Sequence, residues 1–214
     1  MENYKQKFIS LSLEIGALKF GEFQLKSGRI SPYFFNMGLF SSGPLIKKLG
    51  DFYAAALINS NINYDMVFGP AYKGIPIVAA LASSLSTSYQ LDKPFVYNRK
   101  EVKDHGEGGV TVGEKLGGNV VIVDDVITAG TAIREAVDII NNAGATTTGI
   151  VISLDRQEKG IGALSAAEEI SNSLNIPVIS IANLDEVIDY IENNPSDYGQ
   201  HMDQIKKYRE EYGI

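Results

Sequence analysis

The stretch Val120-Val121-Ile122-Val123-Asp124-Asp125-Val126-Ile127-Thr128-Ala129-Gly130-Thr131-Ala132 decides the fold. Its first four residues are apolar and β-branched, which is typical of a parallel strand buried on both faces. Two carboxylates follow where such a strand leaves the sheet, and a short loop then leads into a helix. Strand, acid pair, loop and helix in this order predict an α/β protein with a binding site at the strand's end.

The loop over residues 126–132 has the features of a phosphate seat. Thr128 and Thr131 offer hydroxyls, and backbone N–H groups at the start of a helix attract anions. Gly130 lets the backbone approach the anion closely and tolerates a positive φ. A phosphorylated sugar fits, since its phosphate would occupy the loop while its vicinal hydroxyls donate to Asp124 and Asp125. The alternative is a strand with a polar end and an ordinary loop.

Composition bounds the function classes. The chain has 214 residues, 44% hydrophobic and 21% charged, which suits a single globular domain. It has no cysteine, which excludes disulfides and thiolate chemistry and agrees with a reducing cytoplasm. It shows no signal peptide and no apolar run of about 18 residues, so we expect a cytoplasmic protein outside the membrane. A net charge of −7 argues against a nucleic-acid binder.

The first 40 residues lack the alternation of helices and strands that is predicted for the remainder of the chain. We expect a helix over residues 2–15 and two short strands over 20–25 and 31–36, joined by a turn that contains Lys26 and Arg29. This region would form a hood over the sheet. Neighbouring residues on a strand point to opposite faces, so either Phe34 or Phe35 would pack against a planar ligand unless a helix covers both. Arg29 is interpreted as an exposed turn cation.

Helices and strands alternate from Pro44 onward. Helices are predicted over residues 45–58, 74–85, 131–142, 165–174, 184–193 and 195–212, and strands over 65–69, 94–98, 146–154 and 177–181. Lys73, in the turn that follows the strand 65–69, and Arg156, just after the strand 146–154, lie at strand ends. Parallel sheets bind ligands at that edge, so both cations are expected at the same crevice as Asp124 and Asp125.

A second diagnostic stretch is Arg99-Lys100-Glu101-Val102-Lys103-Asp104-His105-Gly106-Glu107-Gly108-Gly109. It combines clustered cations with three glycines in four residues, so we expect a mobile basic loop that closes on an anionic substrate. The alternative on composition alone is a charged, solvated hairpin tip.

These motifs together resemble those of the type I phosphoribosyltransferases, and of the orotate phosphoribosyltransferases in particular. The resemblance is carried by the stretch 120–132, the loop 99–109, Lys26, Phe34-Phe35 and Arg156, and it runs from about residue 19 to residue 156. It implies one domain over residues 1–214, with a mostly parallel sheet flanked by helices, a hood from about residues 1–40 and a flexible lid. It also implies transfer of the phosphoribosyl group from phosphoribosyl diphosphate to N1 of orotate with inversion, in UMP biosynthesis.

The resemblance also implies roles for individual residues. Orotate would contact Lys26, Phe34, Phe35, Thr128 and Arg156. Phosphoribosyl diphosphate would contact Lys26, Tyr72, Lys73, Arg99, Lys100, Lys103, His105, Asp124, Asp125, Val126, Ile127, Thr128, Ala129, Gly130, Thr131 and Ala132. Catalysis would rest on Lys103, Arg99, His105, Asp124 and Asp125, with the largest effect from Lys103. No residue is assigned as a general base for the orotate nitrogen.

Mg²⁺ would arrive with the diphosphate and would reach Asp124 or Asp125 directly or through water, without a dedicated protein site. The family further implies a homodimer in which Lys100 acts on the partner's site. Three alternatives remain: transfer to a purine or another base, a regulator that only senses phosphoribosyl diphosphate, and a generic nucleotide binder. The first is disfavoured by Lys26, Phe34-Phe35 and Arg156, since an uncharged base offers these cations no carboxylate. The second is disfavoured by the complete basic loop. The third is disfavoured because the sequence has no G-x-G-x-x-G or Walker motif.

Overall fold

The computed structural model describes residues 4–25, 28–103, 109–160 and 162–214, and its centre is a six-stranded sheet. Five neighbouring strands are parallel, and the edge strand β5 is antiparallel to β4. In spatial order the strands are β5 (Gly109–Gly113), β4 (Phe95–Lys103), β3 (Met66–Gly69), β6 (Asn119–Asp124), β7 (Thr146–Asp155) and β8 (Val178–Asn183). This arrangement confirms the predicted α/β fold with a mostly parallel sheet.

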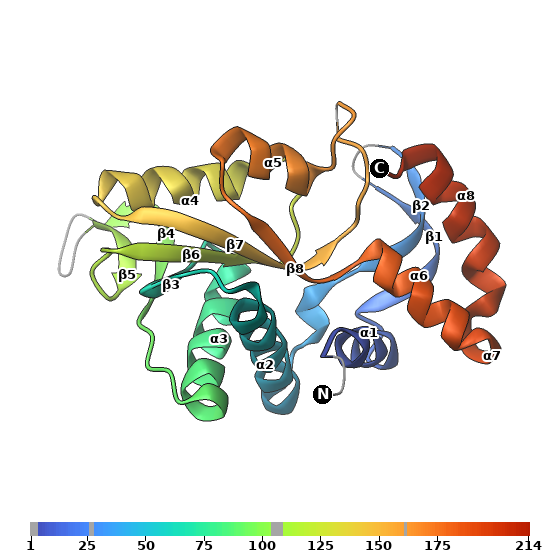
Figure 1. Ribbon diagram of the computed structural model, residues 1–214, viewed down its shortest axis with the longest axis horizontal. Coiled ribbons are helices and arrows are strands. Elements are labelled where there is room, and N and C mark those ends of the chain that lie inside the picture. The colour runs from blue at the N-terminus through green and yellow to red at the C-terminus, as the bar shows by residue number, and fades with distance from the viewer. Residues whose placement is uncertain (1–3, 26–27, 104–108, 161) are drawn as a thin grey trace.

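Helices cover both faces of this sheet (Figure 1). Figure 1 shows α2 (Gly43–Ser60) and α3 (Gly74–Tyr89) on one face, and α4 (Thr131–Asn142) and α5 (Ala166–Leu174) on the other. The residues of β6 alternate between two hydrophobic cores. Val121 and Val123 belong to the core on the α2–α3 side, whereas Val120 and Ile122 belong to the core beneath α4 and α5. The strand is therefore buried on both faces, as its composition predicts.

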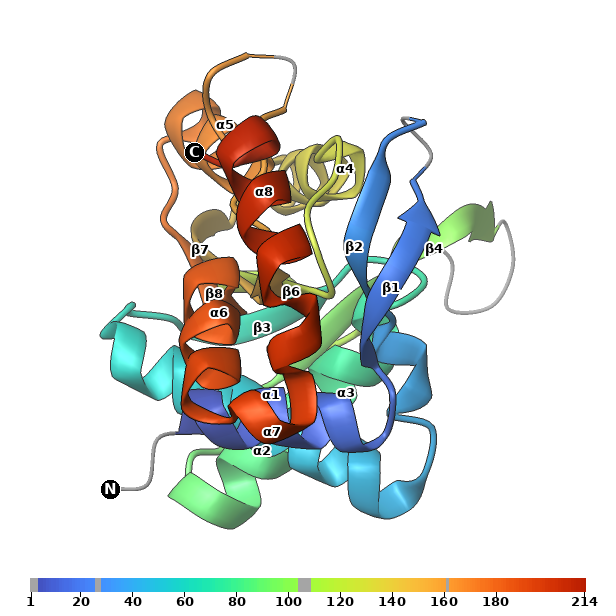
Figure 2. The same ribbon diagram turned by 90° about the vertical axis from the view of Figure 1, so that its right-hand side faces the viewer.

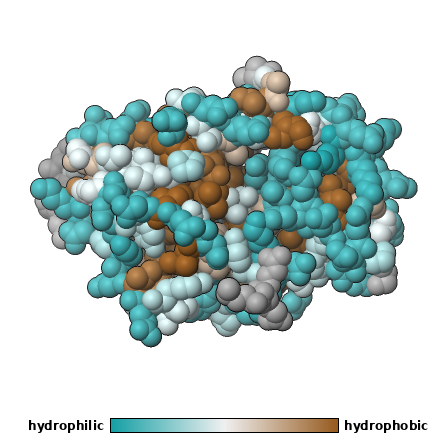
Figure 3. Space-filling model, viewed as in Figure 1, coloured by the Kyte–Doolittle hydropathy of each residue, from teal (hydrophilic) through white to brown (hydrophobic). Residues whose placement is uncertain are grey.

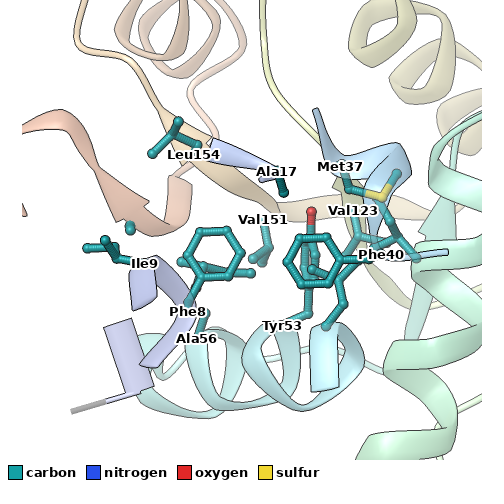
Figure 4. Close-up of a cluster of buried hydrophobic side chains, with 14 of the residues drawn as sticks. Phe8, Ile9, Ala17, Met37, Phe40, Tyr53, Ala56, Val123, Val151 and Leu154 are labelled. Carbon is teal, nitrogen blue, oxygen red and sulfur yellow. The ribbon is translucent and has the colours of Figure 1, made fainter. Parts of the chain in front are cut away.

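The N-terminal helix packs into the first of these cores. Figure 4 shows Phe8 of α1 (Tyr4–Glu14) between Ile9 of the same helix and Tyr53 of α2, with Val123 and Val151 of the sheet in the same cluster. Phe8 also lies 5.5 Å from the ring of Phe52 and 6.2 Å from that of Phe40. This packing joins the N-terminal region to the sheet.

A two-stranded hood follows α1. It consists of β1 (Leu18–Gln24) and β2 (Ile30–Phe35), which are antiparallel, and it continues into a short 3₁₀ helix (Met37–Leu39). Figure 2 shows this hairpin standing beside α8 (Met202–Tyr212). The rings of Tyr33 on β2 and Tyr208 on α8 meet edge to face at 6.2 Å. The hood is thus supported by the C-terminal end of the chain.

The C-terminal helices differ from the prediction in one respect. The helix α6 (Leu184–Asn193) is found as expected, but the helix predicted over residues 195–212 is divided. It consists of α7 (Pro195–Tyr198), a 3₁₀ turn (Gly199–His201) and α8. Glycine is a poor helix former, and the ring of Phe20 in the hood packs against both Tyr198 and His201 at this turn.

The strand β4 also differs from the prediction, because it extends through Arg99 and Lys100 to Lys103. The expected loop over residues 99–109 is therefore partly wrong. Pairing with β5, in which Asn98 lies opposite Thr111 and Lys103 opposite Gly109, satisfies backbone groups that a loop would leave to water. Residues 104–108 lie outside the described residues.

The surface seen in Figure 3 is mostly hydrophilic, and hydrophobic side chains show mainly between the helical layers, where the strands lie. Across the described ranges, no helix has both the length and the apolar character that crossing a membrane requires.

Candidate active site

Four of the predicted site residues lie at or just beyond the carboxyl ends of the paired parts of parallel strands. Lys73 is in the loop after β3, β6 ends in Asp124, and Arg156 follows β7. Arg99 lies within β4, two residues after the last residue that pairs with β3. The four strands are parallel neighbours, so these ends share one edge of the sheet. An ion pair between Lys73 Nζ and Asp125 Oδ2 at 2.5 Å joins the loops after β3 and β6 directly. Lys73 is therefore not the free surface cation that its exposure alone would suggest.

The acid pair is held by its backbone from two sides. The carbonyl of Asp124 accepts a hydrogen bond from the Tyr53 hydroxyl of α2 at 2.7 Å. The carbonyl of Asp125 accepts from the Ser153 hydroxyl of β7 at 2.5 Å and from the Ser153 N–H at 2.9 Å. Sequence reasoning missed Tyr53 and Ser153, because their roles depend on contacts between distant segments. These bonds fix the position of two carboxylates that are 9% and 7% exposed.

Burial is the largest influence on the charge of Asp124. It raises the pKa of the Asp124 carboxyl to about 7, and the negative charge of Asp125 adds to the effect. The Asp125 N–H, which donates to Asp124 Oδ1 at 2.9 Å, lowers the pKa, as do the charges of Lys73 and Lys100. The pair thus favours a ligand that brings hydroxyl donors or positive charge.

The loop after the acid pair has the conformation expected for an anion seat. Gly130 has a φ of 71° and is the N-cap of α4, which has no side-chain cap. A Cβ at this position would lie 2.3 Å from the Cδ1 atom of the buried Ile170, so the position needs glycine in both respects. Thr128, Ala129 and Thr131 are exposed, whereas Val126 and Ile127 are half-buried against the two cores and Ala132 is half-buried.

The loop after β3 is fixed at its base and open at its tip. The Ala71 N–H donates to Oδ1 of the buried Asn98 on β4 at 2.7 Å. Gly69 and Gly74 approach so closely that a Cβ on Gly69 would lie 2.2 Å from the Gly74 carbonyl oxygen. Tyr72 is 72% exposed, and the Lys73 side chain extends to Asp125.

The basic stretch is only partly described. Arg99 donates from Nη1 to the carbonyls of Gly109 and Thr111 on β5 at 3.3 and 3.2 Å. Lys100 forms a long ion pair with Glu135 of α4 at 3.5 Å. Lys103 is described only by its backbone as the last residue of β4, and His105 lies outside the described residues.

Arg156 lies between β7 and the hood. Its Nε and Nη2 atoms donate to Oε1 of Glu158 at 2.9 and 2.6 Å, and Nη2 also reaches the Ser31 hydroxyl at 3.3 Å. The guanidinium lies over the ring of Tyr33, 5.0 Å from its centroid. Burial lowers the pKa of Arg156, but the neighbouring Tyr33 and Glu158 outweigh burial and leave it raised. Sequence reasoning missed Glu158 and Tyr33.

The two phenylalanines of β2 point in different directions, as the alternation predicts. Phe35 is half-buried and packs 6.0 Å from the ring of Phe8, whereas Phe34 is 42% exposed and stacks at 5.5 Å on Phe23. Arg29 was expected to be an exposed turn cation, but it is half-buried and has partners. Its guanidinium lies 4.8 Å from the centroid of the Tyr212 ring, and Nη1 donates to the Lys159 carbonyl. Lys26 lies outside the described residues.

The chain is similar in sequence and in structure to known proteins. The phosphoribosyl transferase domain family matches residues 40–162, more than half of the chain. Orotate phosphoribosyltransferases from Mannheimia succiniciproducens and Marinobacter nauticus are 53% and 54% identical over 100% of this chain and 100% of each of theirs. The crystal structure of orotate phosphoribosyltransferase from Francisella tularensis matches with a TM-score of 0.88 and 44% identity, and covers 97% of this chain and 100% of that one.

Proposed function

This chain belongs to the orotate phosphoribosyltransferase family, and from that premise we propose how its residues transfer the phosphoribosyl group. Orotate and phosphoribosyl diphosphate give orotidine 5′-monophosphate and diphosphate, with inversion at the anomeric carbon, as a step of pyrimidine biosynthesis in the cytoplasm. The observation that supports this most strongly is the 53–54% identity to orotate phosphoribosyltransferases along the full length of both partners.

The sugar phosphate would bind across the end of β6. Its 5′-phosphate would lie in the loop 126–132, where Gly130 leaves the start of α4 open to an anion. The ribose hydroxyls would donate to Asp124 and Asp125. The raised pKa of Asp124 supports this assignment, because a nearly buried carboxylate without enough donors gains most from new ones.

The departing diphosphate builds negative charge, which the enzyme must stabilise while water is kept out. Lys73, Arg99, Lys100, Lys103 and His105 would supply the positive charge. Lys73 is already at the site through Asp125, and its side chain is 57% exposed and so accessible to a ligand. When the diphosphate binds, Lys73 would either leave Asp125 and contact the diphosphate, or contact both at once.

Mg²⁺ fits the donors at the end of β6. Within the described ranges, no three or more His, Cys, Asp or Glu side chains converge to hold a metal. Asp124 and Asp125 would offer one or two carboxylate oxygens, and diphosphate oxygens and water would supply the other ligands. The ion would neutralise charge on the diphosphate.

Orotate would lie between the hood and β7. Lys26 and Arg156 would bind its carboxylate, Thr128 would contact it, and Phe34 or Phe35 would cover its ring. The exposed ring of Phe34 is the better placed of the two, because Phe35 packs into the core. An uncharged purine would give the guanidinium no carboxylate to pair with. In this proposal the chain works as one domain over residues 1–214, with residues 1–40 as the hood.

The proposal includes a homodimer in which Lys100 contributes to the partner's site. Within one protomer Lys100 pairs with the exposed Glu135 at 3.5 Å, a weak surface contact that a stronger anion would displace.

Product analysis tests the reaction. The purified protein, orotate, Mg²⁺ and phosphoribosyl diphosphate are incubated, and products are separated and identified by mass and by the NMR coupling of the anomeric proton. We expect diphosphate and the β-anomer of orotidine 5′-monophosphate in equal amounts. Free ribose 5-phosphate without a nucleotide would contradict the proposed transfer.

A further inference from the structure

Arg156 is restrained on several sides before any ligand binds. One carboxylate oxygen, Glu158 Oε1, accepts from both Nε and Nη2, which holds the plane of the guanidinium. The ring of Tyr33 lies against its face, and the Ser31 hydroxyl accepts from Nη2. The Arg156 side chain is 22% exposed and that of Glu158 is 12% exposed, so this ion pair is largely shielded from water.

Glu158 is itself held by the hood. Its Oε1 atom accepts a third hydrogen bond, from the Tyr33 hydroxyl, at 2.6 Å. Burial raises the pKa of Tyr33 well above its ordinary value, so this hydroxyl remains a donor at neutral pH. Oε1 of Glu158 therefore accepts hydrogen bonds both from Tyr33 of β2 and from Arg156, which follows β7. Glu158 thus connects the hood to Arg156.

The backbone around Glu158 is fixed by the end of the chain. Glu158 and Gly213 form an antiparallel bridge, the Lys159 N–H donates to the Tyr212 carbonyl at 2.7 Å, and the Ile214 N–H donates to the Gln157 carbonyl at 3.1 Å. These bonds fix the backbone from which the Glu158 side chain extends.

We propose that Glu158 is a positioning residue for the base: it fixes the Nε edge of Arg156 so that the rest of the guanidinium meets the carboxylate of an anionic pyrimidine. This inference rests on the proposed function and deepens it. A flexible arginine must lose rotamer freedom when it binds a ligand, whereas Arg156 has already lost it in the folded chain. The benefit should appear in orotate binding and leave phosphoribosyl diphosphate binding unchanged.

The experiment compares Glu158→Ala and Glu158→Gln with the unmodified chain. Alanine removes the acceptor, whereas glutamine keeps an acceptor oxygen and loses the charge. We expect Glu158→Ala to raise the KM for orotate about tenfold and Glu158→Gln to raise it by less, with kcat and the KM for phosphoribosyl diphosphate within about twofold. The control is Glu192→Gln, which weakens an exposed ion pair between Glu192 of α6 and Lys206 of α8 and should leave both KM values unchanged.

Three results would overturn the inference. Equal increases of both KM values would make Glu158 a structural residue. Unchanged orotate binding in the variants would mean that Glu158 does not position Arg156 for the base, and tighter binding would mean that it competes with the substrate for Arg156. If Glu158→Ala does not fold, an orotate KM in Glu158→Gln at or below the unmodified value would equally contradict it. An unmodified chain that consumes no orotate would instead refute the proposed function.

Discussion

Replacing Asp124 by asparagine should stabilise the folded chain at neutral and alkaline pH. Asparagine keeps the Oδ1 acceptor for the Asp125 N–H, and it removes a charge that is only 9% exposed and lies beside a second carboxylate. The folded pKa of about 7 lies above the ordinary value of 3.8, so the folded state binds this proton more tightly than the unfolded state.

The direction and the size of the stability change follow from the difference between the folded and unfolded pKa values of Asp124. Below pH 3.8 the carboxyl is protonated in both states and has no effect. As pH rises toward 7, the unfolded state ionises first and the chain loses stability. The difference between the two pKa values corresponds to about 4 kcal/mol, which is the full penalty above pH 7. Asp124→Asn should therefore raise the free energy of unfolding by up to about 4 kcal/mol at pH 8 and by less than half of that at pH 5.

Urea unfolding of the ligand-free protein at pH 5 and pH 8 measures this gain. Asp138→Asn, which removes an exposed carboxylate of α4, controls for the loss of one negative charge. A stability difference that does not change with pH, or an Asp124→Asn variant that is less stable at pH 8, would refute the account of the acid pair. If Asp124 also binds the ribose, the stabilised variant should have a much lower kcat/KM.

Three other substitutions test the proposed roles. Lys103→Ala should lower kcat about 100-fold or more in a folded protein, because a cation that stabilises the leaving group is lost; near-normal turnover would remove Lys103 from catalysis. Arg156→Ala should raise the KM for orotate about 10- to 100-fold at an unchanged KM for phosphoribosyl diphosphate; equal losses would make it structural. Gly130→Ala should cost about 1–3 kcal/mol in urea unfolding, since alanine is strained at a φ of 71° and meets Ile170; an unchanged midpoint would contradict this.

Local sequence signals located the elements around the acid pair well. The helix predicted over residues 131–142 has those bounds in the structure, because Gly130 precedes it and Gly144, with a φ of 76°, follows it. The strand before Asp124 was also evident, since an apolar β-branched run predicts burial on both faces. In these cases short-range chemistry decides the conformation.

The features that local sequence patterns do not predict depend on contacts between segments that are far apart in the chain. The extension of β4 depends on pairing with β5, and the break at Gly199 coincides with the packing of Phe20 from the hood. The contact of Arg29 with Tyr212 cannot be predicted from local sequence, because the two residues are far apart in the chain. Glu158 is near Arg156 in sequence, yet its role depends on Tyr33 and on the end of the chain, which no local pattern brings together.

The most direct test of the central claim is an absorbance assay with several bases in parallel. The purified protein is mixed with phosphoribosyl diphosphate and Mg²⁺, and orotate, uracil, hypoxanthine or adenine is added separately while its absorbance is followed. The account predicts that orotate alone is consumed, and only when both the diphosphate and Mg²⁺ are present. Consumption of a purine in place of orotate, or binding of phosphoribosyl diphosphate without consumption of any base, would contradict it.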